Sequence, residues 1–152
     1  MDELHTIRIG VLKDFAKRAL WHCLSNDVFK VGRGKSDVQA DMMSAQVMRA
    51  DLRRWYDEYA QTHKGEHITK LQGLTYKMLG SRNAPRLKAK ATECKYLFLY
   101  VADLLHRFHA VLPHIEDWRM YAAAMSTYLA LIKTHARVVP LAALQDLRPM
   151  TV

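Results

Sequence analysis

Basic side chains gather in one window of the chain, from Lys64 to Lys95. Eight Lys and Arg residues in this window stand against two acids, so it carries +6 of the chain's formal +8. The eight are Lys64, Lys70, Lys77, Arg82, Arg86, Lys88, Lys90 and Lys95. Clustered cationic side chains bind phosphate and other anions. The window is therefore where we expect binding chemistry.

The middle of this window also carries a helix-start signal. Asn83-Ala84-Pro85 places a proline where the first turn of a helix lacks an N–H partner anyway. Cations at that end are disfavoured, because the helix dipole puts positive potential there. A bound anion would remove the conflict, and helix N-termini bind phosphate. The predicted anion-binding residues are Lys77, Arg82, Arg86, Lys88, Lys90 and Lys95.

The overall charge favours acidic partners, since the sequence pI is about 9.6. We therefore expect a non-enzymatic basic binding module for nucleic acid or another polyanion. A solvated polar face is the plainer explanation of the same residues. The alternative function is a helical protein–protein interaction or self-assembly domain, with a homo-oligomer or a helical partner, cut from a longer chain.

Metal binding and catalysis have weaker support. Asp103, His106 and His109 are weak metal candidates, because their i, i+3, i+6 spacing spreads them over about 120° of a helix. An ion pair between Asp103 and Arg107 is the simpler interpretation. No nucleotide-binding glycine pattern or nucleophile motif occurs. We expect no catalytic residue, no cofactor and no enzyme activity.

The sequence pattern predicts that the elements positioning these residues are helices. Long amphipathic segments cover 2–24, 36–62, 85–112 and 114–137, and shorter ones 69–79 and 141–147. Short connections between long helices favour an all-α bundle of four long helices plus one or two short ones. We expect one domain over 1–148, with a flexible linker at 31–36 and a tail at 149–152.

Two capping boxes and one apolar stretch refine this plan. Ser36 to Gln39 and Thr69 to Gln72 both have the pattern in which two side chains satisfy free backbone N–H groups at a helix start. Residues 96–105 are apolar nearly all round, which places their helix at the middle of the fold. Three tryptophans, Trp21, Trp55 and Trp118, are predicted to anchor one core.

Compartment is indicated by the cysteines and by hydropathy. Cys23 and Cys94 lack a metal-binding or disulfide-rich context, which predicts two buried reduced thiols in an intracellular protein. The N-terminus lacks a signal-peptide pattern. The longest apolar run, Tyr96 to Ala102, falls far short of the roughly 20 residues that a membrane span needs.

Overall fold

The computed structural model describes residues 7–135. The predicted helix 141–147, the tail 149–152 and the ends of two long predicted helices (2–6 and 136–137) lie outside them. The chain divides into two compact units, Met1–Arg119 and Met120–Val152. The first contains the elements discussed below, and the described part of the second is the remainder of the last helix.

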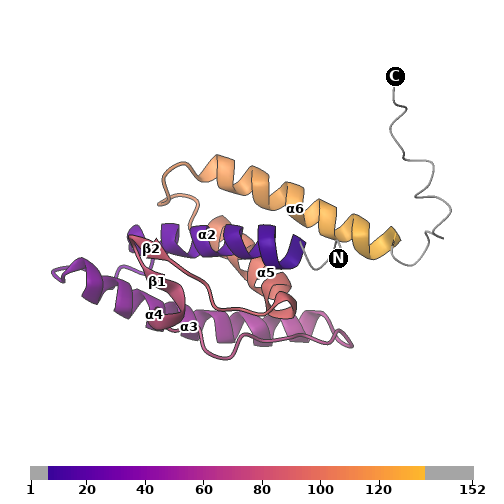
Figure 1. The fold of residues 1–152 in the computed structure, drawn as a ribbon, viewed down its shortest axis with the longest axis horizontal. Helices are drawn as coiled ribbons and strands as arrows, with labels where there is room; N and C mark the ends of the chain where they lie inside the picture. Colours follow the sequence, from indigo (N-terminus) through magenta and orange to yellow (C-terminus); the bar gives the residue numbers. More distant parts are fainter. Residues whose placement is uncertain (1–6, 136–152) are drawn as a thin grey trace, which may run out of the picture. The chain divides into compact units, whose positions relative to one another are not determined.

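The all-α prediction is confirmed, since 66% of the structure is helix and 3% strand. Within residues 7–135, four helices have seven or more residues and pack together. In chain order the elements are η1 (Ile7–Leu12), α2 (Lys13–Ser25), α3 (Asp37–Thr62), α4 (Tyr76–Leu79), β1 (Gly80–Ser81), β2 (Ala84–Pro85), α5 (Ala91–Arg107) and α6 (Ile115–His135) (Figure 1).

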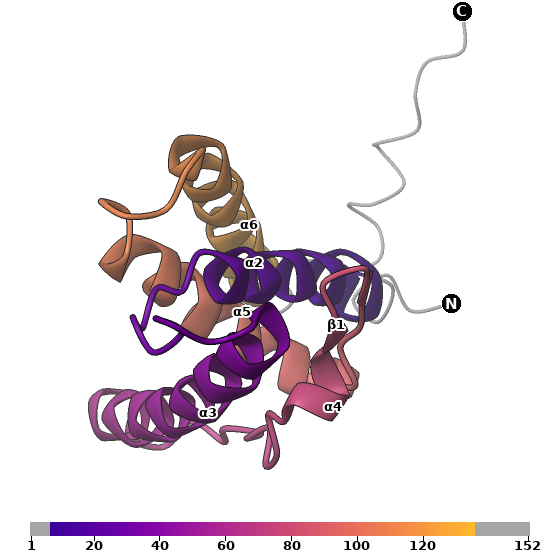
Figure 2. The ribbon, with the colours of Figure 1, turned by 90° about the vertical axis from the view of Figure 1, so that its left-hand side faces the viewer.

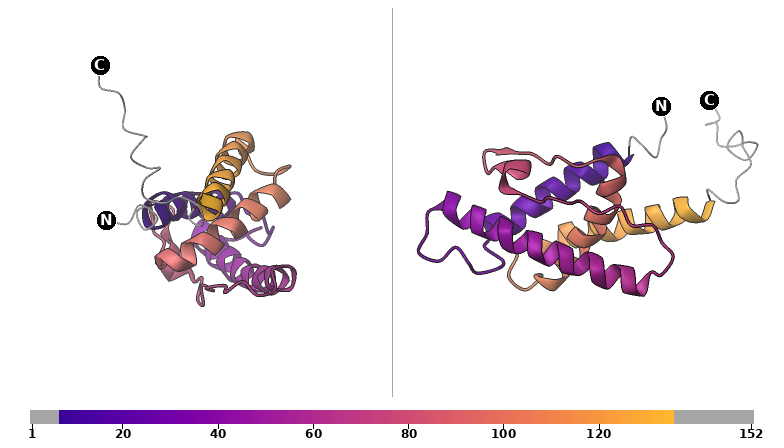
Figure 3. Two further views of the ribbon diagram at one scale, coloured as in Figure 1. Left: turned by 90° about the vertical axis from the view of Figure 1, so that its right-hand side faces the viewer. Right: turned by 90° about the horizontal axis from the view of Figure 1, so that it is seen from below.

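The core of the first unit forms where α2, α3 and α5 meet (Figures 2 and 3). The prediction that 96–105 lies at the middle is confirmed, because most of that stretch is buried. Its fully buried side chains include Leu97, Phe98, Tyr100, Val101, Leu104 and Leu105. Phe15 of α2 packs against Phe98 at 5.5 Å between ring centroids and against Trp118 at the same separation. These rings tie α2, α5 and the first turn of α6 together.

The first long predicted helix is two elements rather than one. Residues Ile7–Leu12 form a π-helix, and a regular α-helix follows from Lys13 to Ser25. Gly10, which weakens a regular helix because it has no side chain, lies inside the wider turn. The following loop is fastened by Asp27, whose carboxylate accepts hydrogen bonds from the backbone N–H groups of Val31 at 2.9 Å and Gly32 at 3.0 Å.

Helix α3 agrees with its prediction at both ends. The Ser36 hydroxyl accepts from the Gln39 N–H, and the Gln39 side chain accepts from the Ser36 N–H, both at 3.4 Å. This is the predicted capping box. The helix then runs to Thr62, the residue at which its apolar pattern stops.

The predicted helix over 69–79 is wrong except for its last turn. Only Tyr76–Leu79 is helical, and Thr75 caps it by accepting from the Met78 N–H at 3.4 Å. The preceding segment packs irregularly on α3, with the Leu71 N–H donating to the Tyr56 hydroxyl at 3.1 Å. Leu71 and Leu74 are both buried. These tertiary contacts replace the capping box expected at Thr69.

The predicted helix start at Pro85 is also wrong. Pro85 lies in β2, which pairs with β1 in a short antiparallel hairpin. Gly80 opens the hairpin with a φ of 79°, and the Arg86 N–H donates to the Leu79 carbonyl at 2.7 Å to close it. Helix α5 begins instead at Ala91, where the Glu93 carboxylate accepts from the Lys90 N–H at 2.7 Å. It ends at Arg107 rather than at 112.

Candidate anion-binding site

The later helix start removes the electrostatic conflict that the sequence suggested. Arg86 and Lys88 lie in an extended segment before α5, and Lys90 is its N-cap residue. The sequence predicted that these three cations crowd the first turns of a helix, and the structure shows that they do not. An anion is not needed to relieve repulsion from a helix dipole, so any anion site must be argued from the positions of the side chains.

Arg82 is neutralised by carboxylates of α3. Its guanidinium donates to both oxygens of Asp41, at 2.7 and 2.8 Å, and lies 3.4 Å from Asp37. Asp41 is 1% exposed, so this two-point pair ties the hairpin to α3. The hydrogen bond with Asp41 is the main cause of a raised pKa at Arg82. Arg82 is therefore engaged within the fold, and the anion site proposed below does not include it.

The other predicted cations separate into three groups. Lys95 is engaged, since its ammonium lies 3.1 Å from Glu66 and 4.7 Å from the centroid of the Tyr96 ring. Lys77 and Lys90 are exposed, on α4 and at the start of α5, and neither pairs with a described carboxylate. Arg86 and Lys88 line a surface hollow. Of the six, Arg86 and Lys88 come together at this recessed site.

That hollow has a volume of about 380 Å³ and lies between the start of α2 and the segment after β2. Figure 1 shows this segment running alongside α2 on its way to α5. Alternate side chains of an extended chain point to opposite sides. Leu87 is buried, and Arg86 and Lys88 on either side of it are exposed. The lining residues are Gly10, Lys13, Asp14, Lys17, Pro85, Arg86, Leu87 and Lys88.

We call this site the basic hollow, because its lining has four cations and one carboxylate, a net charge of +3. Asp14 accepts from Lys17 at 2.6 Å and from Arg18 at 2.7 Å. The pKa of Asp14 is lowered, mainly by the hydrogen bond from Lys17. In the described structure no carboxylate pairs with the other three cations, which are Lys13, Arg86 and Lys88.

Sequence reasoning missed the two lysines of α2. Lys13 and Lys17 are four residues apart, so they share one face of the helix. This spacing could have indicated a shared basic face of the helix, but it does not show which distant segment Lys13 and Lys17 face. The hairpin that turns Arg86 and Lys88 towards them depends on contacts remote in sequence.

The weak metal candidates do not form a site. Asp103 pairs with Arg107 at 2.8 Å, as its simpler interpretation predicted. His106 and His109 are exposed, and their rings stack 6.0 Å apart. Among residues 7–135 no three His, Cys, Asp or Glu side chains are grouped so that they could hold a metal ion.

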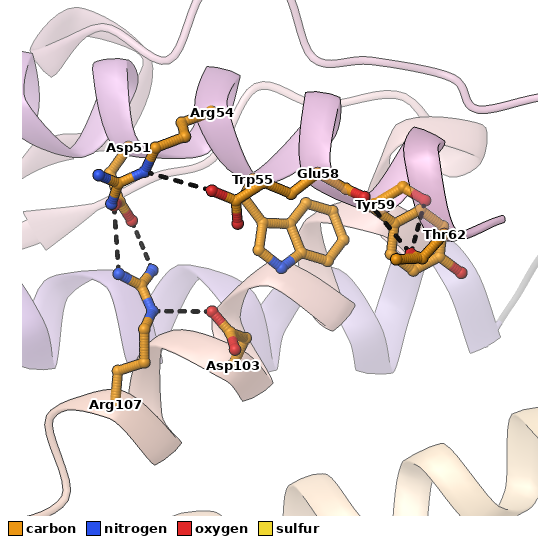
Figure 4. Close-up of a pocket in the computed structure, with 8 residues that line it drawn as sticks. All are labelled: Asp51, Arg54, Trp55, Glu58, Tyr59, Thr62, Asp103 and Arg107. Carbon is orange, nitrogen blue, oxygen red and sulfur yellow. Dashed lines mark hydrogen bonds and ion pairs between the residues drawn. The ribbon is translucent and has the colours of Figure 1, made fainter.

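A second hollow of about 300 Å³ lies between α3 and α5 (Figure 4). We call it the α3–α5 hollow, and its lining is Asp51, Arg54, Trp55, Glu58, Tyr59, Thr62, Asp103 and Arg107. Asp51 is its most buried charge and accepts hydrogen bonds from Arg54, Arg107 and the Tyr100 hydroxyl. Burial alone would raise the pKa of Asp51, but the hydrogen bonds from Arg107 and Tyr100 and the two arginine charges hold it below its usual value.

Both cysteine thiols are buried in the core. Burial raises the pKa of the Cys23 thiol to about 12 and also raises that of Cys94. Cysteine chemistry proceeds through the thiolate, which is scarce at neutral pH under these conditions. Both are free cysteines.

No family model matches this chain, and no curated protein or solved structure matches it significantly. No helix within the described part of the chain is long and apolar enough to cross a bilayer.

Proposed function

We propose that this protein is a non-enzymatic helical module that binds polyanions, nucleic acid first among them, through the basic hollow. The observation that carries the proposal is the convergence of Lys13, Arg86 and Lys88, from two separate segments, on one recess. None of the three pairs with a described carboxylate.

A phosphate-bearing chain suits this arrangement for electrostatic reasons. Unpaired cations around a recess concentrate positive potential, and each one that contacts a phosphate releases a condensed counterion. Lysine and arginine contacts to phosphate carry little sequence information. We therefore expect salt-sensitive binding with weak sequence preference. We also propose an intracellular location, which is supported by the two free, buried cysteines.

The test compares two variants of equal charge. The first replaces Lys13, Arg86 and Lys88 with glutamine; the second replaces Lys30, Arg33 and Lys35, three exposed cations of the α2–α3 loop. Both changes lower the net charge from +8 to +5. Fluorescence anisotropy with a labelled single-stranded DNA, and with RNA, measures the affinity of each protein. We expect the first variant to lose roughly tenfold or more, about 1.4 kcal/mol, and the second to stay near wild type.

Equal losses in both variants would show that net charge, and not the basic hollow, drives binding. Full retention in the first variant would also contradict the proposal. Thermal unfolding of both variants provides the folding control, and heparin serves as a non-nucleic polyanion.

A second candidate, a helical protein-interaction module, is favoured by exposed apolar side chains of α3, among which Val38 and Met42 lie one turn apart on the same face. The exposed fractions are 56% for Val38, 46% for Met42, 37% for Met43 and 37% for Val47. Exposed apolar side chains gathered on one helix are typical of docking surfaces. Light scattering over a range of concentrations tests self-association. A concentration-independent monomer, unchanged when Met42→Ser and Val38→Ser are combined, would count against self-assembly through α3.

A further inference from the structure

We propose that the α3–α5 hollow binds a cationic side chain, specifically an arginine presented by a partner polypeptide. The site is distinct from the basic hollow, with which it shares no lining residue. At about 300 Å³ it is at the small end of ligand pockets, a size suited to one side chain rather than to a large cofactor.

Aromatic rings supply one wall of this hollow. Trp55 and Tyr59 lie one turn apart on α3 with ring centroids 4.9 Å apart, and Tyr59 stacks in turn on His63 at 3.8 Å. In Figure 4 the Trp55 indole extends from α3 towards α5. Because Tyr59 already stacks on Trp55 and on His63, we assign the planar guanidinium to the Trp55 ring, and tryptophan is the best aromatic partner for such a cation.

Carboxylates with unused acceptor capacity supply the charge. Glu58 is 66% exposed and reaches only Arg54, at 3.8 Å. Asp103 uses Oδ2 to accept from Arg107, and its Oδ1 has no hydrogen bond to any described residue. Figure 4 shows Glu58 coming from α3 and Asp103 from α5. A guanidinium between them would donate to both helices.

The two arginines of the hollow do not cancel this preference. Arg54 and Arg107 both donate to Asp51, which holds them at the wall. The complete lining then carries two cations and three carboxylates, a net charge of −1 in a chain of net charge +8. An anion would face Glu58 and Asp103, whereas a monocation brings the lining to neutrality.

The Trp55 indole N–H adds a donor for the polypeptide that carries the arginine. Nε1 forms no hydrogen bond with any residue of the described structure, and Figure 4 shows it on the side of the ring that faces α5. A tryptophan N–H inside a recess usually finds an acceptor. A peptide carbonyl next to the bound arginine can accept a hydrogen bond from this N–H, whereas a free guanidinium ion has no acceptor.

The experiment titrates the intact protein with N-acetyl-L-arginine amide and follows the Trp55 indole ¹H–¹⁵N NMR signal, assigned with a Trp55→Phe variant. We expect a saturable shift with a Kd of about 1–10 mM, as suits one side chain. N-acetyl-L-citrulline amide, a neutral probe of nearly the same shape, should produce no saturable shift. A combined Glu58→Gln and Asp103→Asn variant should weaken arginine binding by about tenfold or more.

The matched control combines Asp57→Asn and Glu116→Gln, two exposed carboxylates outside the hollow, and should leave the affinity unchanged. Because Asp103 also pairs with Arg107, Glu58→Gln alone is measured as well, with an expected loss of about threefold. The proposal is overturned if arginine amide gives no saturable shift, if the citrulline probe binds equally, or if Glu58→Gln and the control bind alike.

Discussion

At the scale of single residues, Asp51 is a buried carboxylate that is held by donors from two helices. Its side chain is 7% exposed and accepts from Arg54, Arg107 and Tyr100, so it joins α3 to α5. Because Asp51 is both buried and hydrogen-bonded, removing one of its partners should lower the stability of the fold more than the same change at the surface. The sequence did not indicate this role: Asp51 was not distinguishable from the exposed acids of the same helix.

Removing this carboxylate should destabilise the fold. Asp51→Ala removes the acceptor of two Arg107 hydrogen bonds, so that Arg107 keeps only Asp103, and it leaves the buried Tyr100 hydroxyl only the Met48 carbonyl at 3.5 Å. We expect the free energy of unfolding to fall by about 3 kcal/mol. Asp57→Ala is the matched control on the same helix, since Asp57 is 70% exposed and pairs only with Lys70. It should change stability by less than about 1 kcal/mol. Urea unfolding followed by circular dichroism measures both, and similar losses would contradict the assignment.

The contribution of Asp51 should also depend on pH in one direction. Its pKa is lower in the folded protein than the ordinary aspartate value, so its stabilisation is complete above that ordinary value, about 3.9. The contribution is lost as the pH falls through the lowered folded-state pKa. The stability difference between wild type and Asp51→Asn should therefore be constant from about pH 5 to 8 and shrink below about pH 4. If the stability difference between the two proteins instead grows as the pH falls, the folded-state pKa of Asp51 is raised and the prediction is wrong.

At the scale of elements, local signals predicted α3 and failed at the hairpin. The Ser36 capping box involves residues three apart, so the sequence contains the whole interaction. Thr69 and Pro85 carry equally good local signals, but distant contacts override them. Tyr56 takes the Leu71 N–H, and Asp41 holds Arg82 beside the hairpin. The helix-start signal was therefore correct at Ser36 and wrong at Thr69 and Pro85, because the sequence does not reveal the tertiary contacts that compete with it.

The hairpin depends on Gly80, and this gives a prediction for the element. A Cβ at Gly80 would lie 2.3 Å from the Ala84 carbonyl oxygen, a backbone atom that cannot move without breaking the β1–β2 pairing. Gly80→Ala should cost roughly 3 kcal/mol in unfolding free energy and weaken polyanion binding, because Arg86 and Lys88 follow the hairpin directly. If Gly80→Ala lowers stability but leaves polyanion binding unchanged, the hairpin does not position the basic hollow for binding.

Gly34→Ala is the matched control for that substitution. Gly34 has a similar positive φ of 72°, but a Cβ there meets nothing within 4 Å. It should therefore show only the cost of the left-handed backbone, roughly 1 kcal/mol. The difference between the two variants isolates the steric contact at the hairpin.

At the scale of the whole molecule, the positive charge of the sequence leads to the proposal of an acidic partner, but it does not show where on the fold such a partner would bind. Six residues were selected along the sequence, and the fold brings together two of them with two lysines of α2. Arg82 and Lys95 are used within the fold instead, paired with Asp41 and Glu66. Residues near one another in sequence share a charge run, whereas a site requires convergence in space.

Salt dependence distinguishes this convergence from diffuse attraction by the whole molecule. If Lys13, Arg86 and Lys88 each displace one counterion from single-stranded DNA, together they contribute about −2 to the slope of log K against log salt. The variant with all three replaced by glutamine should therefore have a slope shallower by about 2, measured from 50 to 200 mM salt. The Lys30, Arg33 and Lys35 variant carries the same net charge and should keep the wild-type slope. Equal slopes for the two variants would mean that phosphates contact the molecule over its whole basic surface, with the basic hollow contributing nothing special.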